Sequence, residues 1–111
     1  MAFVALDVAI ELITVLQPVL RLIARRDPKL ADQIRRASQS NALNLAEGSD
    51  RLGRDQARFY RTALASLTEV RGALRVAVAS GHVTPADLAP VDPVLSRARG
   101  LDWGLVHRKR G

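Results

Sequence analysis

Hydrophobic residues recur along the chain at steps of three and four, the spacing that places side chains on one face of an α-helix. This pattern predicts four helices, over residues 3–25, 28–48, 54–80 and 93–107, with a short basic tail at the C-terminus. No segment shows the alternation of apolar and polar residues that is typical of a half-buried strand. Four amphipathic segments with short links predict an all-α fold, in which residues 1–111 form a single antiparallel up-down four-helix bundle.

The first helix carries two adjacent apolar stripes instead of one. One stripe consists of Leu6, Ala9, Ile13, Leu16, Leu20 and Ile23, and the other of Val8, Leu12, Val15, Val19 and Leu22. Together they make the helix apolar over most of its circumference, so that it needs cover on two sides. Because the chain is short, we expect the second cover to come from another copy of the protein, in a homo-oligomer.

Charged residues interrupt this hydrophobic N-terminal region. Asp7 and Glu11 lie within it, and the first basic residue is Arg21. A signal peptide places basic residues before an uninterrupted apolar stretch, and a membrane-spanning helix needs about twenty nearly uncharged residues. The pattern therefore predicts a cytoplasmic protein that has no contact with a membrane.

The second helix combines clear end signals with a polar residue on its apolar face. Asp27 and Pro28 have the order of an N-cap and a first helical residue, and Gly48 marks the expected end. Asn41 lies on the apolar face, and Asn44 lies at its margin. Because buried amides need hydrogen-bond partners, we expect Asn41 to pair at a helix interface rather than to take part in catalysis.

The third helix has the most regular apolar face, which consists of Tyr60, Ala63, Leu67, Val70, Leu74 and Ala77. Gly81 follows it and can adopt the left-handed conformation that ends a helix. Gly72, inside the helix, costs about 1 kcal/mol relative to alanine, and we expect it to permit a close approach of another helix. The fourth helix has a shorter apolar face of Val94, Ala98, Leu101 and Leu105.

The residue types and motifs exclude most enzymatic sites. The chain has no cysteine and only two histidines, His82 and His107, neither of them in an H-E-x-x-H or E-x-x-H motif. Walker, G-x-G-x-x-G and G-x-S-x-G motifs are also absent from the sequence. We therefore expect a protein without enzymatic activity, metal or cofactor.

Basic residues outnumber acidic residues by 17 to 11, which gives a net charge of +6, and 15 of the bases are arginine. Arginine forms planar, bidentate contacts with phosphate and carboxylate, so this balance suits a nucleic acid or an acidic protein as partner. Residues 25–75 hold eleven bases and six acids, whereas residues 1–24 hold one base and two acids. The positive charge therefore belongs mainly to the two middle helices.

Six arginines of this region are the candidate nucleic-acid-binding residues: Arg35, Arg36, Arg51, Arg54, Arg58 and Arg61. Helical spacing places the last three opposite the apolar face of the third helix, Arg51 precedes them on the same side, and the other two project from the second helix. Contacts from such residues to phosphates are independent of sequence and depend strongly on salt. The alternative is a solvated helix face whose charges pair within the helix, for example Arg51 with Asp55.

Three segments resemble a known family of small four-helix-bundle proteins, first noticed in intervening sequences of bacterial large-subunit ribosomal RNA genes. The family pattern runs Q-I-R-R-A, then S-I-P-x-N-I-A-E-G-S, then S-L-x-E in the third helix. The matching segments here are Gln33-Ile34-Arg35-Arg36-Ala37, Asn44-Leu45-Ala46-Glu47-Gly48-Ser49 and Ser66-Leu67-Thr68-Glu69. The chain departs from the pattern where Asn41-Ala42 replaces Ile-Pro, and where Gly53 replaces a serine cap and leaves Gln56 without its capping partner.

The resemblance implies a homo-oligomer, most often a pentamer, with no established enzymatic activity. Related bundles serve as accessory proteins of diversity-generating retroelements, where basic pentameric barrels engage a reverse transcriptase and nucleic acid. The resemblance also implies structural roles for the motif residues Asn44, Glu47, Gly48 and Glu69. Of these, Asn44 and Glu47 would hold the second helix to its neighbours, and Glu47 would pair with an arginine of the third helix.

Two hypotheses about function follow from the sequence. The first is a non-enzymatic, oligomeric accessory protein that binds RNA or DNA through its outward arginines. The second is an interaction scaffold for an acidic protein or an enzyme, such as a reverse transcriptase, without nucleic-acid binding. The natural ligand and the biological process are not encoded in any motif of the chain.

Overall fold

The computed structural model describes residues 3–108, and the last three residues of the predicted basic tail lie outside this range. The described residues form four α-helices and one short 3₁₀ helix: α1 (Val4–Ala24), α2 (Pro28–Ser49), α3 (Gly53–Ala79), η1 (Pro85–Leu88) and α4 (Asp92–His107). No strand occurs within residues 3–108, so the prediction of an all-α fold is confirmed. The ends of the four α-helices lie within one residue of the predicted ends.

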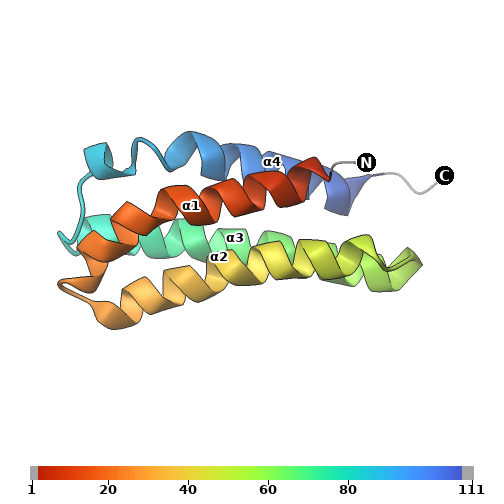
Figure 1. Cartoon of the computed structure of the whole chain (residues 1–111), viewed down its shortest axis with the longest axis horizontal. Coiled ribbons are helices and arrows are strands. Elements are labelled where there is room, and N and C mark those ends of the chain that lie inside the picture. Colours follow the sequence, from red (N-terminus) through yellow and green to blue (C-terminus); the bar gives the residue numbers. More distant parts are fainter. Residues whose placement is uncertain (1–2, 109–111) are drawn as a thin grey trace.

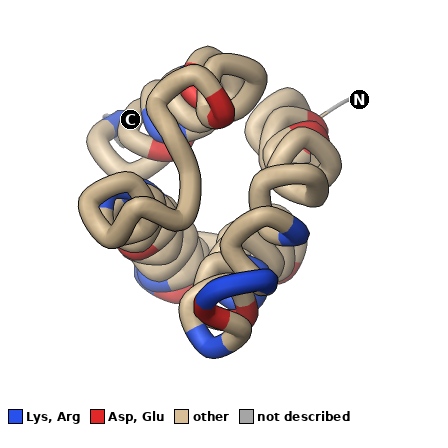
Figure 2. The backbone as a smooth tube through the Cα atoms, turned by 90° about the vertical axis from the view of Figure 1, so that its left-hand side faces the viewer, with Lys and Arg blue, Asp and Glu red and all other residues tan. Residues whose placement is uncertain are grey.

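The helices pack side by side into a bundle of 47 × 22 × 21 Å. The links after α1 and α3 lie at one end of the bundle, and the link after α2 lies at the other end (Figure 1). The main contacts join α1 with α2, α2 with α3, α3 with α4, and α4 with α1. Consequently α1 and α3 lie diagonally across the bundle, as the view along its axis shows (Figure 2).

The core follows the apolar face predicted for the third helix. All six residues of that face, from Tyr60 to Ala77, are buried. Four of them, Leu67, Val70, Leu74 and Ala77, belong to the main core cluster together with Leu12 and Leu16 of α1, which are 0% exposed. A smaller cluster near the start of α1 contains Ala5, Ala9, Ala42, Leu45, Tyr60 and Ala63. Burial of this regular face is the main reason that α3 forms one uninterrupted helix.

The ends of the helices use the signals expected from the sequence. The Oδ1 atom of Asp27 accepts a hydrogen bond from the backbone N–H of Leu30 at 3.0 Å, so Asp27 is the N-cap of α2. Gly81 has a φ of +77°, which favours glycine, and it follows the end of α3 as predicted. Thr84 and Asp87 form a reciprocal capping box that begins η1.

The two apolar stripes of α1 are covered within a single chain. Helices α2 and α4 pack against α1 from two sides, and buried residues come from both stripes. The expected second cover by another copy is therefore not needed for these stripes, and the homo-oligomer stays a prediction. Two apolar residues of α1, Val4 and Ile10, remain 45% and 52% exposed on its outer side.

Two glycines differ from their expected roles. Gly48 lies one residue before the end of α2 at Ser49, and it is buried against α3. A Cβ atom at this position would lie 2.8 Å from Tyr60 Cε1 and 2.9 Å from Phe59 Cβ, so glycine permits the close approach of α2 and α3. Gly72 is exposed, and a Cβ there would meet nothing within 4 Å, so its expected role in close packing is wrong.

The fourth helix is rotated relative to the predicted face. Its buried residues are Leu95, Ala98 and Asp102, whereas Val94, Leu101 and Leu105 are only partly buried. The reason is that α4 packs between α1 and α3 and must present its buried side to both. Among the described helices, none combines the length and the apolar composition that crossing a bilayer requires.

Candidate nucleic-acid interface and buried polar contacts

The outer face of α3 is the most basic surface that a single helix contributes. The helix carries five arginines against two acids, Asp55 and Glu69. Arg54, Arg58 and Arg61 are exposed on the side away from the buried residues Tyr60 and Ala63. The row therefore points outward, as its spacing along the helix predicts.

Exposed carboxylates pair with several of the candidate arginines. Arg58 lies 2.9 Å from Asp55, and Arg51 lies 3.1 Å from Glu47 and 3.4 Å from Asp55. The hydrogen bond and the charge of Glu47 raise the pKa of Arg51 above its ordinary value. The Arg51–Asp55 pair weighed in the sequence is present, whereas Glu47 pairs with Arg51 of the link rather than with an arginine of α3.

Phe59 brings Arg51 and Arg58 together over its ring. The guanidinium carbons lie 5.5 Å (Arg51) and 4.9 Å (Arg58) from the ring centre, within the range of a cation–π contact. The ring thus positions two basic side chains near Arg54, which has no ion pair within residues 3–108. Arg61, one further turn along the helix, is likewise without an ion pair among the described residues.

Arg35 and Arg36 belong to a different part of the surface. Both pair with Asp32, at 3.3 Å and 3.9 Å. Arg36 lines a polar groove between α2 and α3, about 530 Å³ in volume, together with Glu69. The six predicted arginines therefore form two groups: Arg51, Arg54, Arg58 and Arg61 around the start of α3, and Arg35 and Arg36 on the first half of α2.

The family-motif residues make contacts within or near α2. Asn44 Nδ2 donates to the carbonyl oxygen of Ser40 at 2.8 Å, and the hydroxyl of Ser40 accepts from Ser66 of α3 at 3.0 Å. Asn44 itself therefore bonds within α2, and Ser40 makes the bond to the neighbouring helix. Gln56, expected to lack a capping partner, donates to the carbonyl oxygens of Gly48 at 3.1 Å and Arg51 at 2.8 Å.

A polar contact that the sequence did not predict lies inside the core. Asn41 and Asp102 are 0% and 1% exposed, and Asn41 Nδ2 donates both to Asp102 Oδ2 and to the carbonyl oxygen of Ala63. The expected pairing of Asn41 at a helix interface is confirmed, but its carboxylate partner was missed. Asp102 follows Ala98 by four residues, so helical spacing already placed it beside the apolar face of α4.

Burial raises the pKa of Asp102 from 3.8 to about 6, and the hydrogen bond from Asn41 only partly offsets this effect. Asn41 Oδ1 and Asp102 Oδ1 have no hydrogen-bond partner within residues 3–108. The hydrogen bonds of Asn41 to Asp102 and to Ala63 link three helices inside the core, so we interpret this site as a structural contact.

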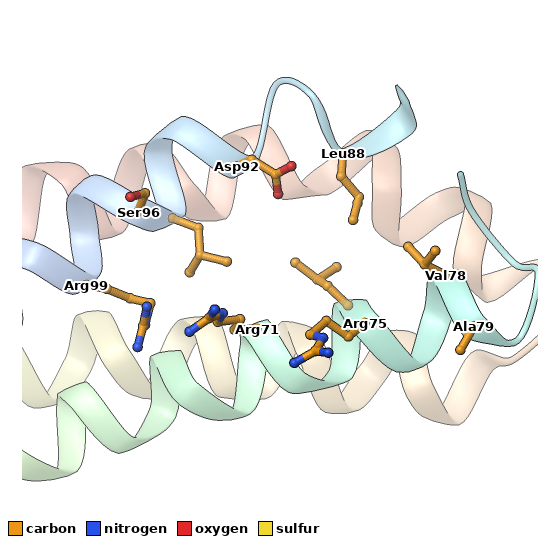
Figure 3. A pocket seen from close by; sticks show the side chains of 10 residues that line it. Arg71, Arg75, Val78, Ala79, Leu88, Asp92, Ser96 and Arg99 are labelled. Atoms are coloured by element: carbon orange, nitrogen blue, oxygen red, sulfur yellow. The ribbon is translucent and has the colours of Figure 1, made fainter. Parts of the chain in front are cut away.

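A second group of arginines, also missed in the sequence, surrounds an apolar groove between α3 and α4. Arg71 and Arg75 of α3 and Arg99 of α4 line this groove of about 460 Å³, and Asp92 lies at the start of α4, across from the two arginines of α3 (Figure 3). Its floor consists of Leu74, Val78, Leu88 and Leu95. The signal for this group in the sequence was the four-residue spacing of Arg71 and Arg75 beside the apolar face of α3. Arg99 joins these two arginines only because α4 packs against α3.

Comparisons with known proteins agree with the fold. A family model described as "23S rRNA-intervening sequence protein" matches residues 5–99. A crystal structure of a protein of unknown function from the S23 ribosomal protein family of Bacteroides thetaiotaomicron VPI-5482 is 15% identical. It matches with a TM-score of 0.82 over 93% of this chain and 98% of that chain. Among curated proteins, none matches this chain.

Proposed function

We propose that this chain, which belongs to the 23S rRNA-intervening sequence protein family, is a cytoplasmic accessory protein. It would bind RNA or DNA as a homo-oligomer. The family is one of unknown function, and no enzymatic family is indicated. Binding would use the arginines around the start of α3 and would not depend on base sequence. We refer to Arg51, Arg54, Arg58 and Arg61 below as the arginine face.

The exposed arginine row on the outer side of α3 is the observation that carries this proposal. Arg54 and Arg61 have no ion pair within the described residues, so each offers a full fork of donors to a phosphate. In a homo-oligomer this face would occur once per copy. Several weak phosphate contacts would then act together on one nucleic-acid strand.

The acids beside the arginine face do not prevent such binding. The pairs of Arg51 and Arg58 with Asp55 and Glu47 are between 42% and 65% exposed at their side chains. Exposed ion pairs of this kind contribute between about 0 and 1 kcal/mol, so a phosphate can replace a carboxylate at little cost. Asp55 contacts both Arg51 and Arg58, whose guanidinium groups lie over the ring of Phe59.

Binding of the purified protein to mixed RNA and mixed DNA over a series of salt concentrations tests the proposal. Retention at low salt and a steep loss of affinity with rising salt are expected. Replacing Arg54, Arg58 and Arg61 by glutamine should reduce the slope of log affinity against log salt by up to about 2.7 per protomer.

A matched control removes the same number of charges elsewhere. Arg21, Arg26 and Arg97 are exposed and lie outside the arginine face. Glutamine at these three positions lowers the net charge equally but should leave most of the salt slope in place. Equal slopes for the two triple variants would contradict the assigned face. Absence of any retention at low salt would contradict nucleic-acid binding itself.

A further inference from the structure

Three guanidinium groups on the opposite half of α3 and on α4 lack an anionic partner. Arg71, Arg75 and Arg99 line the groove of about 460 Å³, and none of them forms an ion pair within residues 3–108. The Nε atom of Arg99 is buried and has no hydrogen-bond partner there. A buried donor without an acceptor is costly, so an acceptor that enters the groove would relieve this cost.

The floor of the groove indicates what kind of molecule enters. Leu74, Val78, Leu88 and Leu95 contribute aliphatic side chains to the same lining as the arginines and Asp92. A nucleic-acid backbone would meet the guanidinium groups but would leave this surface without an apolar partner. The groove is complementary to a helix that has both acidic and aliphatic side chains on one face.

The chain itself contains a helix face of this description. The first half of α1 carries Val4, Asp7, Ile10 and Glu11 outside its buried face, and all four are exposed. Neither Asp7 nor Glu11 forms an ion pair within the described residues. The two acids are four residues apart, as are Arg71 and Arg75, so both pairs are separated by one helical turn of about 6 Å.

These two surfaces cannot meet within one molecule. Helices α1 and α3 lie diagonally across the bundle, and the outer face of α1 points away from the core that separates them (Figure 2). We infer that the groove between α3 and α4 receives the outer face of α1 from a second copy of this chain. The two acids of α1 then face Arg71 and Arg75, and Ile10 reaches the aliphatic floor.

This contact is head-to-tail, because it joins two different surfaces of the same chain. Such contacts repeat from copy to copy and produce a ring if the rotation closes, or a filament if it does not. The inference rests on the homo-oligomer of the proposed function and assigns its contact surfaces. It leaves the arginine face at the start of α3 outside the contact, and therefore free for nucleic acid.

Charge reversal with rescue tests the contact. The mass of nuclease-treated protein in solution is measured by light scattering after size separation. Wild type should form an oligomer, and the variants D7R/E11R and R71E/R75E should each move toward the 12.1 kDa monomer. The chain with all four substitutions should regain the oligomer, because the pairs are restored with exchanged signs. The inference would be overturned if the wild type is a monomer, or if D7R/E11R and R71E/R75E both keep the mass of the wild type. It would also be overturned if the variant with all four substitutions folds but does not reassemble.

The control for this experiment reverses two arginines in the other half of the same helix. The variant R54E/R61E changes the charge of α3 by the same amount as R71E/R75E. It should keep the oligomer and weaken nucleic-acid binding, whereas R71E/R75E should dissociate the oligomer. The two proposals can thus fail independently of each other.

A cross-link provides a second measurement that does not depend on charge. The sequence has no cysteine, so introduced pairs report unambiguously. Oxidation of I10C/V78C should give a ladder of covalent multimers on a denaturing gel, because position 10 of one copy lies against the groove of the next. The matched pair I10C/V76C places the second cysteine on α3 at an exposed residue outside the groove and should give no ladder. Equal yields from the two pairs would overturn the assigned contact.

Discussion

Asn41 on α2 and Asp102 on α4 are joined inside the core by a hydrogen bond of 2.7 Å between Asn41 Nδ2 and Asp102 Oδ2. The same nitrogen donates to the carbonyl oxygen of Ala63 on α3 at 2.9 Å. One amide group therefore connects three of the four helices and fixes their register. Asn41 Oδ1 and Asp102 Oδ1 find no hydrogen-bond partner among residues 3–108, so the polar groups of this contact are only partly satisfied.

The variant Asp102→Asn should be more stable than wild type above pH 6. In wild type, burial holds the pKa of Asp102 at about 6 instead of 3.8, so the folded protein binds this proton more tightly than the unfolded chain. The stabilisation that binding of this proton gives to the folded state is therefore complete below about pH 4, and it is lost as the pH rises to about 6. The loss amounts to about 3 kcal/mol, and asparagine avoids it.

Denaturant unfolding of both proteins between pH 4 and pH 8 checks this expectation. The difference in unfolding free energy should grow through the window and then become constant. Asparagine at position 102 can also donate to Asn41 Oδ1, which has no partner within the described residues of the wild type. A difference that does not vary with pH would show that Asp102 titrates normally in the folded protein.

Replacing Asn41 by leucine should destabilise the fold, more so at pH 8 than at pH 4. The substitution leaves the charged Asp102 buried without its donor, which costs about 3 kcal/mol or more. At pH 4 the carboxyl is neutral, and the cost is smaller. The double variant N41L/D102L removes both polar groups and should be more stable at pH 8 than N41L alone. Thermal or urea unfolding at the two pH values measures these differences.

The substitutions Gly48→Ala and Gly72→Ala should act in opposite directions. A Cβ at position 48 would press on Tyr60 Cε1 and Phe59 Cβ at under 3 Å, and relieving such overpacking costs about 1–3 kcal/mol. At position 72 a Cβ meets nothing within 4 Å, so alanine should stabilise the exposed helix by up to about 1 kcal/mol. Urea unfolding gives both values, and a neutral Gly48→Ala would show that α2 and α3 can separate locally.

Removing the charge of Asp55 should strengthen nucleic-acid binding. Asp55 pairs with Arg51 and Arg58, so Asp55→Asn leaves Arg58 without an ion pair among the described residues, while Arg51 keeps its pair with Glu47. We expect a higher affinity at low salt and a slope of log affinity against log salt that steepens by up to about 0.9 per protomer. Asp32→Asn, which frees the distant Arg35 and Arg36, provides the comparison. Weaker or unchanged binding by Asp55→Asn would show that the arginine face does not meet phosphate.

Helical periodicity allowed much of the fold to be predicted. The apolar residues of α3 repeat regularly from Tyr60 to Ala77, and all six members of that face are buried. Asp27 and Gly81 end or begin elements through contacts with residues close in sequence, so their roles were also predictable. The outward row of Arg54, Arg58 and Arg61 follows from the same periodicity. These features depend on the chain within a few turns of each residue.

Contacts between distant helices could not be predicted from the sequence. The burial of Asp102 depends on how α4 is rotated between α1 and α3, and the roles of Gly48 and Gly72 depend on where α2 and α3 cross. The groove of Arg71, Arg75 and Arg99 exists because two helices far apart in the sequence lie side by side.

The sequence by itself determined four helices, a cysteine-free chain and a surplus of positive charge on its middle segment. The tertiary structure decided which side of α1 is covered by its own chain and which acidic side remains exposed. The physical reason is that periodicity defines the face of each helix, whereas close packing against two neighbours decides which flank of that face is buried.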